Sequence, residues 1–172
     1  MSAPSQRIAV GVVVERRRAT SQWAEYLWRP TAVLAGLPEA ATWTQLAEAG
    51  DAVTFYAGPA EIALYSSEAE NYRRNLRSGA PAIWVTMHAT AGEPPYVIGG
   101  VTADPAEGEG WTEPGQAIVE VVAMPETVRE EIADFIARFP LQPGFVKRQR
   151  DRADPEAMAR RGPQTGRRNE RR

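Results

Sequence analysis

The pattern of hydrophobic and polar positions divides the chain into short strand-like runs and two amphipathic helices. Arg7 to Val14 holds four valines and one isoleucine almost without interruption, which is typical of a strand that is central in a sheet. Ile83 to Met87, Tyr96 to Thr102 and Ala117 to Val122 are predicted strands on the same grounds.

Proline and glycine set other predicted boundaries. Pro30 interrupts the apolar segment Ser21 to Leu37, so we expect two short edge strands or one bent strand there. Gly58-Pro59 separates two alternating runs, Ala52 to Ala57 and Ala60 to Ser66, and predicts an antiparallel hairpin.

Helix signals occur twice. Ser67 and Glu70 have the spacing of a capping box, and Gly79 is placed to end the helix that follows. Pro125 suits the first turn of a second helix, whose apolar residues recur at helical spacing. We therefore predict an α+β fold, with a mostly antiparallel sheet or open barrel of about six or seven strands and two packed helices.

The same pattern predicts the domain organisation. The chain has 172 residues, of which 43% are hydrophobic and 24% charged, as expected of a globular protein. We expect a frayed N-terminus at 1–6, a single globular domain at 7–139, and a disordered tail at 140–172, because the tail has too few large apolar residues to offset its ordering entropy.

Charge is distributed unevenly. The formal net charge is −2, yet the tail after Pro140 holds ten basic and four acidic residues, which gives +6 there and −8 for residues 1–139. The candidate basic residues of the tail are Lys147, Arg148, Arg150, Arg160, Arg161, Arg167 and Arg168. Clustered arginines attract nucleic acid or an acidic protein surface, but no aromatic residues alternate with them for base stacking, so nucleic acid is not the expected partner. We favour a solubilising tail without a dedicated partner.

Residue counts exclude several chemistries. The chain has no cysteine and a single histidine, His88, which rules out disulfides, thiolate zinc sites, cysteine nucleophiles and multi-histidine metal sites. His88 lies at a strand end, where we expect an ordinary polar residue; a general base oriented by a carboxylate is the alternative. We predict no catalytic residue, no cofactor and no metal.

Residues 104–115 are acidic and rich in glycine, and we expect a mobile loop there. Asp104, Glu107, Glu109 and Glu113 offer oxygen ligands for a hard cation, but without EF-hand spacing, so a solvated acidic loop is preferred. Trp111 is hard to bury in such a loop, and we predict that it contacts a protein partner together with Glu107, Glu109 and Glu113.

Glycines and hydropathy bear on two further alternatives. Gly99-Gly100 either lets a ligand approach the backbone or marks a sheet bulge, and we favour the bulge. The longest apolar run, Ile8 to Val14, is far shorter than the roughly 20 residues of a membrane span, and Glu15-Arg16-Arg17-Arg18 follows it instead of a cleavage site. We expect a cytoplasmic protein without a membrane span.

Several motifs together carry a family resemblance. They are Ile8 to Val14, Ser21-x-Trp23, Trp28-Arg29-Pro30, Ala32-Val33-Leu34, Glu70-x-Tyr72-x-x-Asn75-Leu76 and Pro81-x-Ile83-Trp84-Val85. On these residues the sequence, over about residues 7 to 139, resembles an uncharacterised bacterial domain-of-unknown-function family. Members are typically encoded beside molybdenum-dependent formate dehydrogenases, and some are labelled molybdopterin-guanine dinucleotide biosynthesis protein A.

The resemblance implies a link with molybdenum cofactor enzymes, whereas the residues argue against a transferase. Val14 is followed by Glu15-Arg16-Arg17-Arg18 and not by a glycine-rich loop, and two helices are too few for the crossovers of a parallel sheet. The implied function is that of a non-catalytic accessory or maturation-type protein, which binds a molybdoenzyme subunit or an assembly factor. A small-molecule or nucleotide-binding module and a molybdenum cofactor nucleotidyltransferase are the alternatives.

Overall fold

A computed structural model of the chain describes residues 5–112, 115 and 117–140. Contacts between Cα atoms divide the chain into Met1–Leu141 and Gln142–Arg172, and all the described residues lie in the first unit. In chain order the elements are β1 (Gln6–Arg18), β2 (Tyr26–Ala35), β3 (Thr44–Ala49), β4 (Ala52–Leu64), a 3₁₀ turn (Ser66–Glu68), α1 (Ala69–Leu76), β5 (Ala82–Ala89), β6 (Tyr96–Thr102), α2 (Pro105–Gly110), β7 (Ala117–Ala123) and α3 (Glu126–Ala137).

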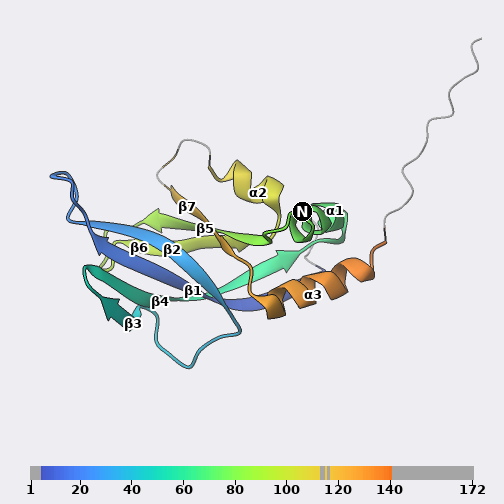
Figure 1. The fold of residues 1–172 in the computed structure, drawn as a ribbon, viewed down its shortest axis with the longest axis horizontal. Coiled ribbons are helices and arrows are strands. Elements are labelled where there is room, and N and C mark those ends of the chain that lie inside the picture. The colour runs from blue at the N-terminus through green and yellow to red at the C-terminus, as the bar shows by residue number, and fades with distance from the viewer. Residues whose placement is uncertain (1–4, 113–114, 116, 141–172) are drawn as a thin grey trace, which may run out of the picture. The chain divides into compact units, whose positions relative to one another are not determined.

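The seven strands form two open antiparallel sheets. One sheet has the order β2-β1-β4-β3 and the other β6-β5-β7. Strand β2 also lies against β7, and β4 against β6, so the two sheets contact each other through these two pairs of strands. Figure 1 shows α1 and α3 at one end of the sheets and the β1–β2 hairpin at the other. The predicted α+β class is confirmed.

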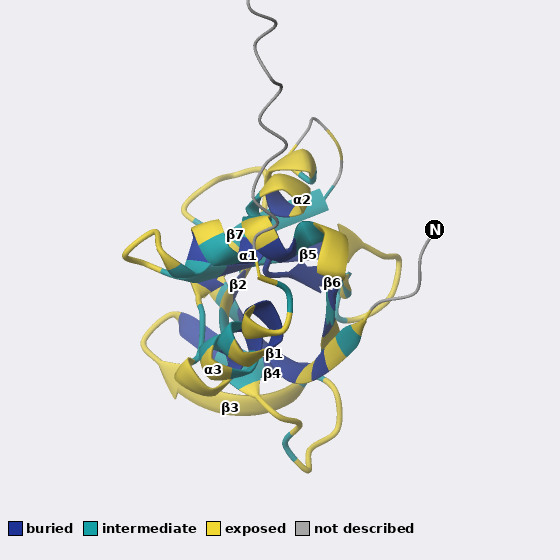
Figure 2. Ribbon diagram, turned by 90° about the vertical axis from the view of Figure 1, so that its right-hand side faces the viewer, coloured by how far each residue is buried: buried dark blue, intermediate teal, exposed yellow. Residues whose placement is uncertain are grey.

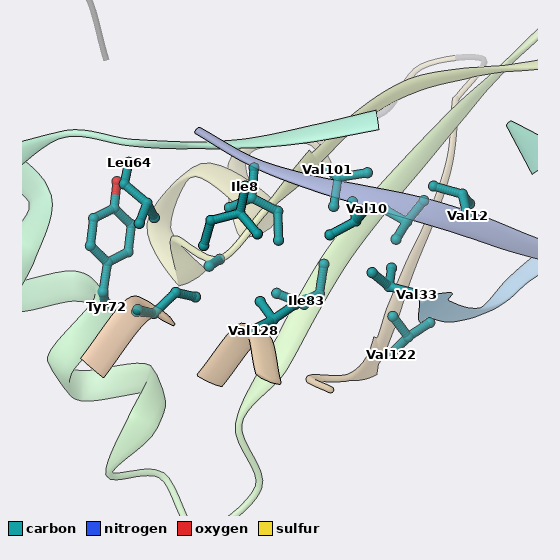
Figure 3. Packing of buried hydrophobic residues seen from close by; sticks show 14 of the residues in the cluster. Ile8, Val10, Val12, Val33, Leu64, Tyr72, Ile83, Val101, Val122 and Val128 are labelled. Atoms are coloured by element: carbon teal, nitrogen blue, oxygen red, sulfur yellow. The ribbon is translucent and has the colours of Figure 1, made fainter. Parts of the chain in front are cut away.

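The core fills the space between the sheets, because alternate residues of each strand face inward. Ile8, Val10, Val12 and Val14 of β1 are all buried, and they face the buried inner residues of β5 and β6. Figure 3 shows Val10 of β1 beside Val101 of β6, with Ile83 of β5 below them. By contrast, β3 is exposed along its whole length, as Figure 2 shows.

Helices α1 and α3 cover one end of this core. Val128, Ile132 and Phe135 of α3 are fully buried, as their helical spacing predicts. Phe135 meets Tyr72 of α1 with ring centroids 6.1 Å apart. The contact joins residues far apart in the sequence and fixes both helices to the same end.

The predicted hairpin at Gly58-Pro59 is wrong, since residues 52–64 form one continuous strand, β4. Gly58, with φ of 139°, lies opposite Val12, and Ala57 is left out of the register with β1. The local turn signal therefore produces a bulge. Pro59 is tolerated because β3 pairs with β4 only as far as Tyr56, and β1 alone is hydrogen-bonded to the strand at Pro59.

The loop expected at 104–115 is also corrected, because Pro105–Gly110 is the helix α2. Asp104 is its N-cap, with Oδ1 accepting a 2.8 Å hydrogen bond from the amide of Ala106, and Pro105 occupies the first turn. Gly108 is needed for packing, since a Cβ there would lie 2.1 Å from Cγ of Trp84. Gly108 lowers the helix propensity of this segment, but it also allows α2 to pack against Trp84.

Two smaller expectations concern α1 and β2. The capping box is not formed: Ser67 donates to the adjacent Glu68 at 3.0 Å, and α1 begins at Ala69 after the 3₁₀ turn. Of the two alternatives for the segment around Pro30, a single strand is present, with its register against β1 shifted beside Pro30.

Candidate functional site

The tip of the β1–β2 hairpin holds the most exposed indole of the described residues. Trp23 is 88% exposed and lies in the loop between Arg18 and Tyr26, which form the last residue pair of the hairpin. The loop is closed by a 2.9 Å hydrogen bond from the amide of Ala19 to the carbonyl of Glu25. The amide of Trp23 donates to Oγ of Ser21 at 3.1 Å, so local hydrogen bonds order the backbone beneath the exposed ring.

The arginine run that leads into this loop is divided between the two faces of β1, because side chains alternate along a strand. Arg17 lies on the outer face, where it donates to Glu15 at 3.3 Å and to Asp51 at 3.2 Å. Arg29 also pairs with Glu15, at 3.4 Å. The hydrogen bond to Glu15, with the attraction of Glu15 and Asp51, raises the pKa of Arg17 above its usual value.

Arg16 and Arg18 lie on the other face of β1, among aromatic rings. The Arg16 guanidinium carbon is 4.6 Å from the ring centroid of Tyr26, 5.4 Å from that of Phe55 and 5.7 Å from that of Trp28. Arg18 approaches the same Tyr26 ring at 5.8 Å. Nε of Arg16 is buried and has no hydrogen-bond partner in the part of the chain that the structure describes.

Trp28 connects this cluster to both sheets. It stacks on Phe55 with a centroid separation of 5.9 Å and meets Trp43 edge-on at 5.9 Å. Its distance to Tyr96, at the start of β6, is 6.2 Å. The end of the body opposite α1 and α3 is therefore closed by aromatic rings and one guanidinium.

A second surface feature lies on the outer face of the β6-β5-β7 sheet. The ring of His88 crosses Gly99, where a Cβ would lie 2.3 Å from Nε2, and Trp111 covers Gly100, where a Cβ would lie 3.3 Å from Cη2. A cleft of about 200 Å³ is lined by both rings, Gly99 and Thr86. Thr86 is 5% exposed, and its hydroxyl has no hydrogen-bond partner among the described residues.

Three features that were weighed separately in the sequence thus meet at one cleft. Gly99 is left out of the pairing between β5 and β6, which confirms the predicted sheet bulge. The glycines make room for the rings of His88 and Trp111, and those rings border the cleft. An imidazole and an indole can together hold a small planar group by hydrogen bonds and stacking.

The predicted acidic residues have different surroundings. Oε2 of Glu107 accepts a 2.6 Å hydrogen bond from the hydroxyl of Thr102, and Asp104 caps α2, so both are engaged in holding that helix. Glu109 is exposed, while Glu113 and the basic tail lie outside the described residues. Within residues 5–112, 115 and 117–140, no group of three or more histidine or acidic side chains is arranged to hold a metal ion.

Sequence reasoning selected Trp111 and missed Trp23. Trp111 is only half-buried, but its ring rests on Gly100, whereas Trp23 protrudes from a polar hairpin loop. The length of β1 is the feature that would have identified Trp23. A strand predicted to extend through Arg18 places Trp23 in the turn that follows it.

Fold and site together define an α+β protein of two antiparallel sheets, with helices at one end and an aromatic, arginine-rich hairpin at the other. Over residues 9–150 the chain matches a family described as Protein of unknown function (DUF3305), and it belongs to that family. No curated protein and no solved structure matches it significantly. None of the helices in the described part of the chain is long and apolar enough to cross a membrane.

Proposed function

We propose that this protein is a non-catalytic accessory protein that acts by binding a protein partner through the β1–β2 hairpin. The observation that carries the proposal is Trp23, an indole that is 88% exposed at the tip of a loop ordered by its own hydrogen bonds. When a partner covers a large apolar ring, the ring is removed from water, and this burial stabilises the complex.

The residues around Trp23 have the composition of a binding hot spot, in which tryptophan and arginine are enriched. Leu27, on the outer face of β2, is 58% exposed, and it lines a shallow hollow of about 230 Å³ with Arg17, Arg29 and Glu15. Apolar contacts from Trp23 and Leu27 would supply affinity, while the flanking charges would set the orientation of the partner.

The partner proposed is a molybdoenzyme subunit, such as one of formate dehydrogenase, or a factor that assembles such an enzyme. This choice rests on the family resemblance of the sequence. The basic tail, through residues such as Lys147 and Arg148, is proposed to speed the encounter by long-range attraction, because charge attraction across water raises the association rate more than the affinity.

Affinity purification of the tagged full-length chain from its own host, followed by mass spectrometry, tests the proposal. We expect a molybdoenzyme subunit or assembly factor to be recovered with the wild-type chain, and much less of it with Trp23→Ala. Trp111→Ala is the matched control, since it removes an equal ring from the other surface. Equal recovery with wild type and Trp23→Ala would contradict binding through the hairpin. A recovered set without a molybdoenzyme subunit or assembly factor would contradict the proposed partner.

The cleft between Trp111 and His88 favours a second candidate, a small-molecule-binding module. Its support is the cleft itself, which is bordered by the rings of His88 and Trp111 and is large enough for a small group. Thr86 also lines the cleft, and its buried hydroxyl has no hydrogen-bond partner among the described residues. Cleft ligands would bind independently of Trp23, so a screen of small planar metabolites against Thr86→Val and Trp23→Ala separates the two candidates.

A further inference from the structure

Two like charges are held against one aromatic ring at the base of the hairpin. The guanidinium carbons of Arg16 and Arg18 lie 4.6 Å and 5.8 Å from the ring centroid of Tyr26. Stacking on the ring attracts each cation, but the two cations repel each other. The ring alone therefore does not neutralise the pair.

The other arginines of β1 and β2 are compensated by carboxylates. Ion pairs among the described residues include Arg7 with Glu61, Arg17 with Glu15 and Asp51, and Arg29 with Glu15. No carboxylate of a described residue lies within 4.0 Å of Arg16 or Arg18. Alternate residues of one run thus differ: Arg17 is paired with acids, whereas Arg16 and Arg18 are not.

Arg16 also carries an unmet hydrogen bond. Its Nε is buried without a partner in the described part of the chain, although a buried charged donor without an acceptor is costly. A guanidinium holds its N–H groups in one plane, as a fork from which a planar or tetrahedral oxyanion can accept hydrogen bonds. Two guanidinium groups without a carboxylate partner favour an anion with several acceptor oxygens.

We propose that Arg16 and Arg18 form a binding site for the phosphate group of a phosphate monoester. A monoester dianion balances two guanidinium charges and offers three acceptor oxygens, whereas a carboxylate or a phosphodiester carries one negative charge. Trp28 and Phe55 complete the site by excluding water from one side of Arg16. The site lies at the base of the hairpin and does not depend on the partner proposed for Trp23.

Titration of the full-length chain with inorganic phosphate at pH 8, followed by the indole N–H signal of Trp28 in NMR spectra, tests the proposal. Trp28 is next to Arg16, so its indole signal reports on this site, and the arginine variants below separate the site from phosphate bound to tail arginines. We expect a saturable shift, and binding at least about tenfold weaker in Arg16→Gln or Arg18→Gln, because each loses a charge-assisted contact.

Arg17→Gln is the matched control and should bind within about twofold of wild type, since Arg17 faces the other side of β1. Dimethyl phosphate and acetate distinguish the ligand classes, and both should bind at least about tenfold more weakly than inorganic phosphate. Two outcomes would overturn the site: no saturable shift of Trp28, or an equal shift in Arg16→Gln and Arg18→Gln. Should Arg16→Gln fail to fold, Arg18→Gln decides alone. Acetate or dimethyl phosphate binding as tightly as phosphate would overturn the monoester assignment.

Discussion

The helix end and the hairpin end of the described domain differ in whether their polar groups are hydrogen-bonded. At the end covered by α1 and α3, the buried side chain of Asn75 makes three hydrogen bonds to backbone groups: Nδ2 donates to the carbonyls of Ala82 and Ala103, both at 2.8 Å, and Oδ1 accepts from the amide of Ala82 at 3.0 Å. The hydroxyl of buried Tyr72 accepts from the amide of Tyr65 at 3.0 Å. Polar groups here are satisfied internally.

At the hairpin end the corresponding groups are left open. Nε of Arg16 has no partner in the described part of the chain, and Trp23 exposes almost its whole ring. Buried polar groups that are hydrogen-bonded stabilise one conformation. An unpaired polar group or an exposed apolar ring can instead stabilise a complex when a partner contacts it. The helix end is therefore stabilised by internal hydrogen bonds, and the hairpin end is the one that we propose for recognition.

The largest expected effect on stability is at Asn75. Asn75→Ala removes these hydrogen bonds from one amide and two carbonyls of the backbone, and it should lower the free energy of unfolding by about 3 kcal/mol. Asn71, which donates to Glu68 and Asp104 from a half-buried position, is the matched control, and Asn71→Ala should cost about 1 kcal/mol. Urea unfolding measures both. Equal losses would show that burial of the Asn75 network is not what stabilises this end.

A second test uses pH. Burial raises the pKa of Tyr72 to about 12. Since the folded pKa exceeds the unfolded value, the contribution of Tyr72 is fully present below about pH 10 and is lost as the pH rises to about 12. The difference in unfolding free energy between wild type and Tyr72→Phe should shift by about 2 kcal/mol across that interval, in favour of the variant. A difference that stays constant with pH would contradict the burial of this hydroxyl.

A smaller effect on stability is expected at Thr86, a buried polar residue that does not follow the difference between the two ends. Its buried hydroxyl has no partner among the described residues, so Thr86→Val removes a polar group that contributes no protein hydrogen bond. Stability should stay unchanged or rise by up to about 1 kcal/mol, as seen in thermal or urea unfolding. A loss above that magnitude would mean that the hydroxyl is hydrogen-bonded in solution.

Much of the fold was predictable because the inner strands carry local signals that agree with their environment. The valines of β1 and the apolar stripe of α3 are examples, since both face the core. Strand β3 gave no signal because all its residues are exposed, so no alternation marks it. Gly58-Pro59 and Gly108 misled because pairing with β1 and packing against Trp84 outweighed local propensity.

The exposed indole of the hairpin could not be predicted, for a related reason. Exposure of an indole depends on what its loop packs against: α2 brings Trp111 onto Gly100, whereas none of the described strands and helices covers Trp23. The division of Arg16, Arg17 and Arg18 between two faces follows from strand alternation, but only once β1 is known to continue to Arg18. Sequence periodicity ends at Val14, where the apolar residues end.

The most direct test of the division between the two ends is to measure binding of the recovered partner by Trp23→Ala beside its own unfolding free energy. The account predicts binding weakened by about 2 kcal/mol, mainly through faster dissociation, with stability unchanged within about 0.5 kcal/mol. Trp111→Ala, measured in parallel, should weaken binding less. Wild-type affinity in Trp23→Ala, with the larger loss in Trp111→Ala, would place recognition on the outer face of the β6-β5-β7 sheet and contradict the account.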